Sequence, residues 1–199
     1  VPAAVNSVAG VPDGARSLVK RDDLTGLGGG GNKTRKLEFL SAEALQQAAA
    51  RAREVSPRAL TLTVITAGAA QSNHARQTAA AAARYGLGCV LALSGMAPAR
   101  TAGNLLLDSL LGARIRWTGD RSSTEVMDEI AAEERSAGRV PYIIPVGGSN
   151  PIGAAAYALA MDELYRQILE QKLNVDHIVV ASGSGGTQAG LVVGARAVH

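Results

Sequence analysis

The sequence predicts an α/β protein built around a mostly parallel β-sheet with helices on both faces. Helical segments alternate with short apolar segments at least four times along the 199 residues. The apolar segments are continuous rather than alternating, as is typical of strands that are buried on both faces. Hydrophobic residues make up 47% of the chain but aromatic residues only 3%, so small aliphatic side chains must fill the core.

Periodicity and helix-terminating residues define the expected helices. Apolar residues recur at spacings of three and four between Leu37 and Ala48, which predicts an amphipathic helix. An alanine-rich helix follows and ends at Gly86, a residue type that favours helix termination. Ser122 or Ser123 is expected to cap a later helix. The expected helices cover 33–55, 72–85, 103–111, 122–138, 153–169 and the chain from 187 onward.

The expected strands are the short apolar segments between these helices. The segment from Leu60 to Thr66 is apolar and β-branched throughout, which is typical of a buried parallel strand. Further strands are expected at 88–93, 113–117, 140–146 and 176–181. In open parallel sheets, ligands bind at the carboxyl ends of the strands, where loops lead into helices. The functional residues are therefore expected in these loops.

Composition excludes several classes of function. The net charge is +3 with no dense run of Lys or Arg and few aromatics, which argues against a nucleic-acid partner. Cys89 is the single cysteine, so no intrachain disulfide or Cys-rich metal site is expected. The three histidines, His74, His177 and His199, lack metal-ligand spacing, so no metal is expected. No apolar stretch is long enough for a bilayer and no secretion signal is visible, so a cytoplasmic protein without a membrane partner is expected.

The first unusual loop places four glycines, Gly28–Gly31, just before Lys33 at the start of a helix. Glycine allows close approach of the backbone to a planar ligand. The helix dipole and the neighbouring Arg35 and Lys36 are expected to lower the pKa of Lys33. A lysine with a lowered pKa is suited to form a Schiff base with an aldehyde. A flexible loop followed by a solvated basic helix start explains the same residues equally well.

The second loop delivers four consecutive polar residues, Gln71, Ser72, Asn73 and His74, to the start of a helix after a buried strand. One of them would suffice to cap the helix, so four favour a ligand site over a plain cap. The free backbone N–H groups of the helix start could bind a carboxylate.

The third loop, Ser182–Thr187, joins a strand to a helix and resembles a phosphate cradle. The lysine of a Walker motif is absent, and the glycines fit a dinucleotide fingerprint only loosely. A nucleotide-dependent oxidoreductase that uses this loop is therefore a weaker alternative. The segment Pro145–Pro151 is interpreted equally well as an ordinary turn or as part of the site. No Gly-x-Ser-x-Gly elbow of a serine hydrolase occurs.

Four blocks of the sequence resemble, in the same order, the motifs of D-cysteine desulfhydrases and 1-aminocyclopropane-1-carboxylate (ACC) deaminases: Gly31–Glu38, Gln71–His74, Pro145–Asn150 and Ala181–Thr187. The resemblance extends from about Val19 to Gly194. It implies the tryptophan synthase β-like pyridoxal fold, with two open twisted parallel-sheet α/β domains and part of the C-terminal region missing. Residues 37–148 would form the smaller domain, and 1–36 with 149–199 an incomplete larger, cofactor-binding domain.

The resemblance also implies roles for individual residues around a pyridoxal 5'-phosphate cofactor. Lys33 matches the lysine that holds the cofactor, Asn32 its polar neighbour, and Asn73 the residue that hydrogen-bonds the phenolic oxygen. Lys33 and Ser72 are the expected catalytic residues, and Ser72, Asn73 and His74 are expected to contact the substrate. ACC deaminases tend to carry Gln at the position of His74. The expected phosphate loop consists of Gly183, Ser184, Gly185, Gly186 and Thr187.

The implied activity is β-elimination from a small amino acid, in which D-cysteine and water give pyruvate, hydrogen sulfide and ammonia. Lys33, once displaced, would remove the α-proton. ACC deaminase or L-cysteate sulfo-lyase activity and a truncated, inactive cofactor-binding chain are the alternatives, and the full-length protein is expected to be a homodimer. Three departures from the family are expected: a missing segment beyond His199, a shorter stretch between Leu93 and Gly103, and extra residues between Val55 and Leu60.

Overall fold

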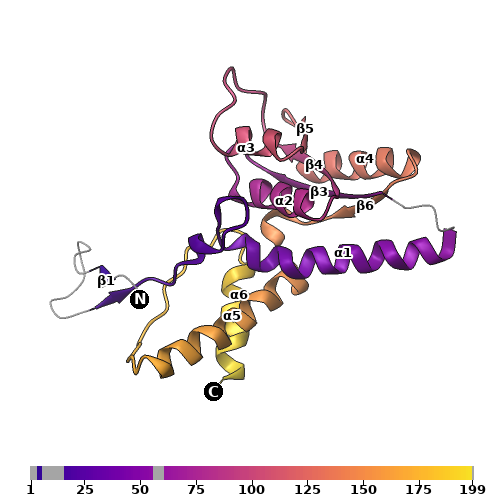
Figure 1. Ribbon diagram of the computed structural model, residues 1–199. Helices are drawn as coiled ribbons and strands as arrows, with labels where there is room; N and C mark the ends of the chain where they lie inside the picture. Colours follow the sequence, from indigo (N-terminus) through magenta and orange to yellow (C-terminus); the bar gives the residue numbers. More distant parts are fainter. Residues whose placement is uncertain (1–3, 6–15, 56–60, 199) are drawn as a thin grey trace.

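The computed structural model describes residues 4–5, 16–55 and 61–198. Its main helices are α1 (Lys33–Val55), α2 (Asn73–Arg84), α3 (Asn104–Leu110), α4 (Ser123–Ser136), α5 (Pro151–Glu170) and α6 (Gly186–Ala197) (Figure 1). Three short 3-10 helices lie at η1 (Asp22–Leu24), η2 (Leu27–Gly29) and η3 (Val146–Gly148). Two of these, η2 and η3, lie in the glycine loop and in the Pro145–Pro151 segment, for which the sequence left an ordinary loop and a functional site equally open.

The central element is a four-stranded parallel sheet with the order β5-β4-β3-β6. Its strands are β3 (Leu62–Gly68), β4 (Gly88–Leu93), β5 (Arg114–Trp117) and β6 (Val140–Ile143). A separate two-stranded antiparallel ladder pairs β1 (Ala4–Val5) with β2 (Ser17–Leu18). The most buried strand, β3, lies between two neighbours, so its polar backbone groups are paired on both sides.

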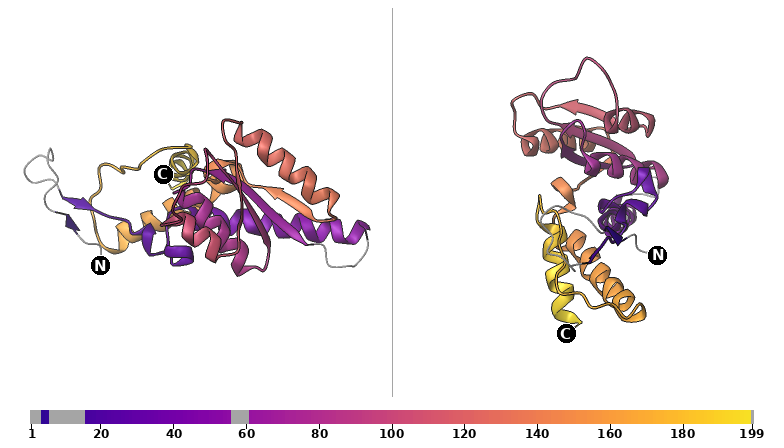
Figure 2. Two further views of the ribbon diagram at one scale, coloured as in Figure 1. Left: turned by 90° about the horizontal axis from the view of Figure 1, so that it is seen from above. Right: turned by 90° about the vertical axis from the view of Figure 1, so that its left-hand side faces the viewer.

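Helices cover both faces of the parallel sheet, in the three layers visible in Figure 2. On one face, Leu37 and Leu40 of α1 pack against β3 and β6, and the alanines of α2 pack against Leu91 of β4. On the other face, Val126 and Ile130 of α4 pack against β3 and β4. Small side chains dominate these clusters, which lets the helices approach the sheet closely, as the composition predicts.

Helices α5 and α6 pack against each other beyond α1, away from the sheet (Figure 1). Glycines of α6 make the close contact possible. A Cβ on Gly190 would lie 2.2 Å from the carbonyl oxygen of Ala154, and one on Gly194 would lie 2.6 Å from that of Ala158. Since α1 contacts both this helix pair and the sheet, its N-terminal end lies between the two groups of elements.

The α/β fold and most predicted elements are confirmed, but the strand expected at 176–181 is wrong. That segment has no regular secondary structure, and Val179 is 95% exposed. Apolar sequence alone does not make a strand, because a strand needs a hydrogen-bonding neighbour, and the described residues provide none here. The edge strand β5 also differs from the prediction of continuous apolarity, since Arg114 and Arg116 alternate with half-buried residues. The division into two domains stays a prediction.

Two expectations fall on residues at the margins of the elements. Leu60, expected to begin the first strand, and the extra residues 56–60 lie outside the described residues. Helix α5 begins at Pro151, two residues earlier than predicted, because the side chain of Asn150 accepts a hydrogen bond from the Gly153 amide at 2.8 Å and caps the helix. Across 4–5, 16–55 and 61–198, no helix is both long and apolar enough to span a bilayer.

Candidate functional site

The glycine run before α1 adopts backbone conformations that other residues rarely adopt. All four residues of Gly28–Gly31 have positive φ, between 57° and 134°. A Cβ on Gly30 would lie 1.9 Å from the carbonyl oxygen of Asp23, and one on Gly31 would lie 2.5 Å from Nε2 of Gln77. The positive φ angles and this close packing account for the glycines of the loop.

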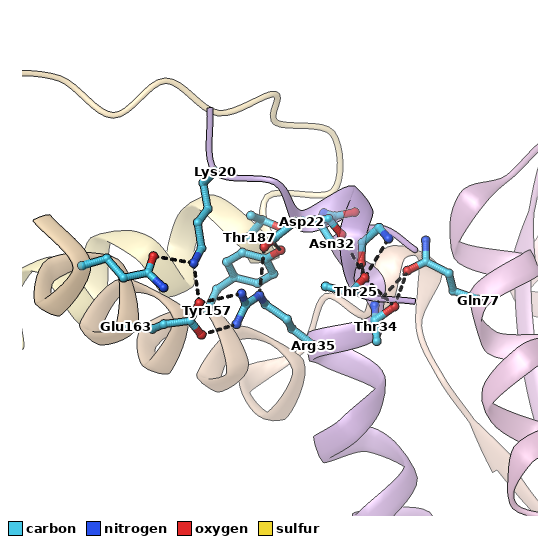
Figure 3. Close-up of polar contacts among 12 residues, drawn as sticks. Lys20, Asp22, Thr25, Asn32, Thr34, Arg35, Gln77, Tyr157, Glu163 and Thr187 are labelled. Carbon is cyan, nitrogen blue, oxygen red and sulfur yellow. Dashed lines mark hydrogen bonds and ion pairs between the residues drawn. The ribbon is translucent and has the colours of Figure 1, made fainter. Parts of the chain in front are cut away.

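Hydrogen bonds join this first loop to the second loop through α2. Gln77 Oε1 accepts from both the backbone N and Oγ1 of Thr34, at 2.8 and 3.0 Å (Figure 3). Arg76 donates through Nη2 to the carbonyl oxygen of Gly30 at 2.7 Å. The start of α1, which carries Lys33, is thus held against the start of α2.

The first loop also contacts the third loop. Asn32 Nδ2 donates to Oγ1 of Thr187 at 3.2 Å, so the residue before Lys33 lies against the first turn of α6 (Figure 3). Gly185 precedes α6 with a φ of 81°, and no side chain caps the helix. In the described part of the chain only the first amide of α6, that of Gly186, bonds a side chain, so the amides that follow it and the positive end of the dipole suit a phosphate.

The segment after β6 supports the third loop. The Ser149 hydroxyl donates to Oγ of Ser184 at 2.6 Å and accepts from the Gly186 amide at 3.3 Å. A Cβ on Gly147 would lie 2.3 Å from Oγ of Ser184. The Pro145–Pro151 segment is therefore packed against the expected phosphate loop and is more than an ordinary turn.

Burial lowers the pKa of Lys33, the direction that the sequence predicts. The predicted contribution of Arg35 is not what the structure shows. Arg35 instead forms ion pairs with Asp22 at 3.1 Å and Glu163 at 2.8 Å, and Glu163 also pairs with Lys20 (Figure 3). The positive charge of Arg35 is thereby balanced by carboxylates on η1 and α5.

Lys36 is a residue that sequence reasoning missed as part of the site. Its side chain is only 1% exposed, and its Nζ donates to the carbonyl oxygen of Gly147 at 3.1 Å. A Cβ on Gly186 would lie 3.0 Å from this Nζ, so the amine lies at the first residue of α6. Burial and the charge of Lys33 lower the pKa of Lys36 to about 8. The spacing of three from Lys33 could have revealed that both lysines share a helix face.

Each polar residue of the second loop has a structural partner. Ser72 caps α2 by accepting from the Ala75 amide at 3.2 Å. Asn73 is exposed, and its Oδ1 accepts from Asn104 Nδ2 at 2.9 Å. Asn104, at the start of α3, was not identified from the sequence, because nothing in its local sequence indicates this long-range contact. The expected substrate and cofactor contacts of Ser72 and Asn73 stay predictions.

His74 is buried rather than exposed, being 5% accessible, and its ring lies against β3. Thr66 donates its hydroxyl proton to the carbonyl oxygen of Ile144 at 2.7 Å, so its oxygen must accept from His74 Nε2, 2.8 Å away. Burial and the charges of Lys33 and Lys36 lower the pKa of His74 to about 3, so the ring is neutral near pH 7. Its Nδ1 then carries no proton, and the ring also interacts with the backbone of Pro145.

Comparisons with known proteins identify the family. Residues 9–199 match the model of the family described as pyridoxal-phosphate dependent enzyme. A putative 1-aminocyclopropane-1-carboxylate deaminase of Pyrococcus abyssi is 46% identical over 189 residues, 94% of this chain and 53% of the relative. The D-cysteine desulfhydrase of Klebsiella pneumoniae is 44% identical over 187 residues, 91% of this chain and 53% of the relative.

Solved structures show the same relationship. The crystal structure of an ACC deaminase homologue has a TM-score of 0.78 and 43% sequence identity, covering 91% of this chain and 51% of that one. The chain spans about half the length of the curated relatives it matches. The expected tryptophan synthase β-like fold class is confirmed. With a family match over nearly its whole length, this chain belongs to the pyridoxal-phosphate dependent enzymes.

Proposed function

We propose that this chain carries the lysine-bearing part of a pyridoxal-phosphate dependent lyase that acts on a small amino acid. The observation that carries the proposal is the contact of Asn32 with Thr187 at 3.2 Å, which brings Lys33 next to the uncapped start of α6. Lys33, whose pKa burial lowers, thus follows directly on a residue that contacts a helix terminus suited to an anion. This arrangement fits an aldehyde that carries a phosphate.

The phosphate would lie at the first turn of α6, in the loop Gly183–Thr187. The helix supplies free N–H groups, and Ser184 supplies a hydroxyl. Lys36 supplies a buried positive charge. Among the described residues its amine donates to the Gly147 carbonyl oxygen and is repelled by Lys33, and it forms no ion pair with a carboxylate. A buried ammonium without a counter-ion is costly, and a bound phosphate would balance it.

The remaining residues would position the substrate. Ser72 accepts from the backbone, so its hydroxyl proton remains available to a substrate carboxylate. Asn73 would donate to the phenolic oxygen of the cofactor. The neutral His74 would present Nδ1 as a hydrogen-bond acceptor and would not act as a proton donor near pH 7.

Pyridoxal phosphate supplies an electron sink for the carbanion that forms at the substrate Cα. Lys33 would hold the cofactor covalently, and its free amine would carry the proton from Cα once substrate has displaced it. Burial favours the neutral form of this amine, which is the form that can act as a base. Ser72 and the N-terminus of α2 would fix the carboxylate and therefore the orientation of the reacting bond.

D-cysteine is the proposed substrate, and its reaction with water gives pyruvate, hydrogen sulfide and ammonia. The 44% identity to a protein named D-cysteine desulfhydrase supports this choice. ACC deamination is the second candidate, since relatives at 46% identity carry that name. A homodimeric full-length protein and a cytoplasmic location stay predictions.

Absorbance spectroscopy of the purified protein with added pyridoxal phosphate tests the role of Lys33. The parent should show the band of a lysine-bound pyridoxal, which sodium borohydride reduces to a stable adduct on Lys33. Lys33→Ala should lose the band, and Lys172→Ala, at an exposed lysine far along the chain, should keep it. The proposal fails if Lys33→Ala retains the band or if the adduct maps to another lysine.

Product assays then separate the candidate substrates. D-cysteine should release sulfide and pyruvate together, whereas ACC deamination would release ammonia from ACC without sulfide. A band without turnover of either compound would indicate a chain that binds the cofactor but is inactive.

A further inference from the structure

Asn104 is the first residue of α3 and joins this helix to the second loop and the start of α2 through both ends of its side-chain amide. Its Nδ2 donates to the carbonyl oxygen of Gln71 at 2.8 Å and to Asn73 Oδ1 at 2.9 Å. Its Oδ1 accepts from Arg76 Nη1 at 3.1 Å. Its backbone N donates to Gln71 Oε1 at 2.9 Å. All of these partners belong to the loop or to the first turn of α2.

The chemistry of the partners fixes the orientation of the Asn104 amide. An arginine side chain can only donate, so the atom facing Arg76 must be oxygen. A backbone carbonyl can only accept, so the atom facing the Gln71 carbonyl must be nitrogen. Both ends of the amide agree, and a flipped assignment would break both contacts.

This orientation in turn fixes the amide of Asn73. Because Asn104 presents N–H to it, the contacting atom of Asn73 must be its oxygen. The Nδ2 of Asn73 is then the free end of the side chain, and Asn73 is exposed. Without Asn104, the two ends of the amide would be free to exchange places, and an oxygen could face a ligand instead.

We propose that Asn104 is a positioning residue that holds the Asn73 side chain with its Nδ2 available to an acceptor atom of the ligand. The inference rests on the proposed function, in which that acceptor is the phenolic oxygen of pyridoxal phosphate. Arg76 extends the same arrangement to the lysine loop, since it bonds both Asn104 and the carbonyl oxygen of Gly30. Through Arg76, Asn104 thus links the second loop to the loop that leads to Lys33.

Two substitutions distinguish positioning from a purely structural role. Asn104→Asp keeps the shape and the acceptor for Arg76 but replaces the donor by an acceptor, so Asn73 should turn its Nδ2 toward Asp and its oxygen toward the ligand. Asn104→Ala only releases the Asn73 amide. Both substitutions remove the hydrogen bond to the Gln71 carbonyl oxygen, so a loss of stability alone does not separate the two roles. The orientation of the Asn73 amide does separate them, because only the positioning role predicts that Asn104→Asp reverses it.

The first measurement needs no cofactor. In the NMR spectrum of the cofactor-free protein, the Asn73 side-chain amide is identified by its absence from the spectrum of Asn73→Asp. In the parent these protons should exchange rapidly with water. In Asn104→Asp they should exchange more slowly, by up to about tenfold, because Nδ2 then donates to the new carboxylate. Equal exchange rates in both proteins would overturn the inference.

The second measurement is the affinity for pyridoxal phosphate, followed by its absorbance band. Losing a hydrogen bond to a charged oxygen predicts about tenfold to hundredfold weaker binding in Asn104→Asp, with a smaller loss in Asn104→Ala. Asn174→Asp makes the same chemical change at an exposed site and should bind as the parent does. Unchanged binding by Asn104→Asp, or a greater loss in Asn104→Ala, would overturn the inference. A missing band in the parent itself would instead refute the proposed function, and the exchange rates would still report the Asn73 orientation.

Discussion

Replacing Lys36 by methionine should stabilise the cofactor-free protein and weaken cofactor binding. Methionine keeps an unbranched side chain of similar length but removes the buried ammonium. The pKa of Lys36 falls from 10.5 to about 8 on folding, mainly because burial disfavours the charge. At 1.36 kcal/mol per pKa unit, the charged lysine costs roughly 3 kcal/mol of stability near neutral pH.

The lost hydrogen bond to the Gly147 carbonyl offsets part of this gain, by about 1 kcal/mol. The expected net gain is therefore about 2 kcal/mol at pH 7, or roughly 4 to 8 °C in the unfolding temperature. The folded-state pKa of Lys36 is below its unfolded value, so protonation favours unfolding. The penalty is full below about pH 8, shrinks as the pH rises toward 10.5, and is absent above it. The difference between variant and parent should accordingly approach zero by about pH 10.

Urea unfolding of both proteins without cofactor, at pH 7 and pH 10, measures the stability difference. Titration with pyridoxal phosphate at pH 7 measures binding, and loss of a charged contact to the phosphate should weaken it by about 10- to 100-fold. The reasoning is refuted if Lys36→Met is less stable than the parent at pH 7. It is also refuted if the variant binds the cofactor as tightly as the parent does.

Three further perturbations have defined outcomes. Gly30→Ala should lower the free energy of unfolding, measured in urea, by more than about 3 kcal/mol, because its Cβ would meet the Asp23 carbonyl. Gly26→Ala has open space around its Cβ and should cost about 1 kcal/mol for its positive φ alone. Equal losses in the two variants would show that the loop adjusts to the added Cβ. Glu134→Gln should lose about 2 kcal/mol at pH 7, because the partly exposed Arg139 and Arg114 bond the buried carboxylate and lower its pKa to about 2. That stability is full above pH 4.5 and is lost as the pH falls toward 2. Denaturation at pH 7 and pH 3 should therefore show the parent converging on the variant in acid. The His74 ring should stay neutral in NMR titrations down to about pH 4, because burial lowers its pKa. The free energy of unfolding should fall as the pH drops from 6.5 to 3. A ring titration with its midpoint near pH 6.5 would contradict the burial of His74.

The sequence was sufficient to predict elements whose signals are local. The periodicity of 33–55 and the apolar run after Leu60 correspond to α1 and β3, because side chains with those spacings are buried on one or both faces of the element. The segment 176–181 has the same local signal and forms no strand. The missing information is non-local, because hydrogen-bonding partners come from elsewhere in the fold.

The parallel-sheet rule correctly predicted a polar loop at the carboxyl end of β3, but it does not account for the other two loops, because neither of them follows a strand of the sheet. The individual contacts were not predictable. Lys36 looks in the sequence like one more base at a helix start, and only packing against Gly147 and Gly186 shows that it is buried. Asn104 stands among apolar residues of a short helix, and its contact with Asn73 joins positions 31 residues apart. Such contacts depend on tertiary structure and leave no periodic signal.

One turn of α1 carries both amines of the site, Lys33 and Lys36, and this sets how the site can move. Residues three apart lie on the same side of a helix, so the spacing between the two anchoring points is fixed by the helix backbone. The other half of the proposed phosphate site belongs to α6, on a different helix. A tilt of α1 relative to α6 would draw both amines away from the phosphate together, so cofactor retention should follow the position of α1 as one rigid body.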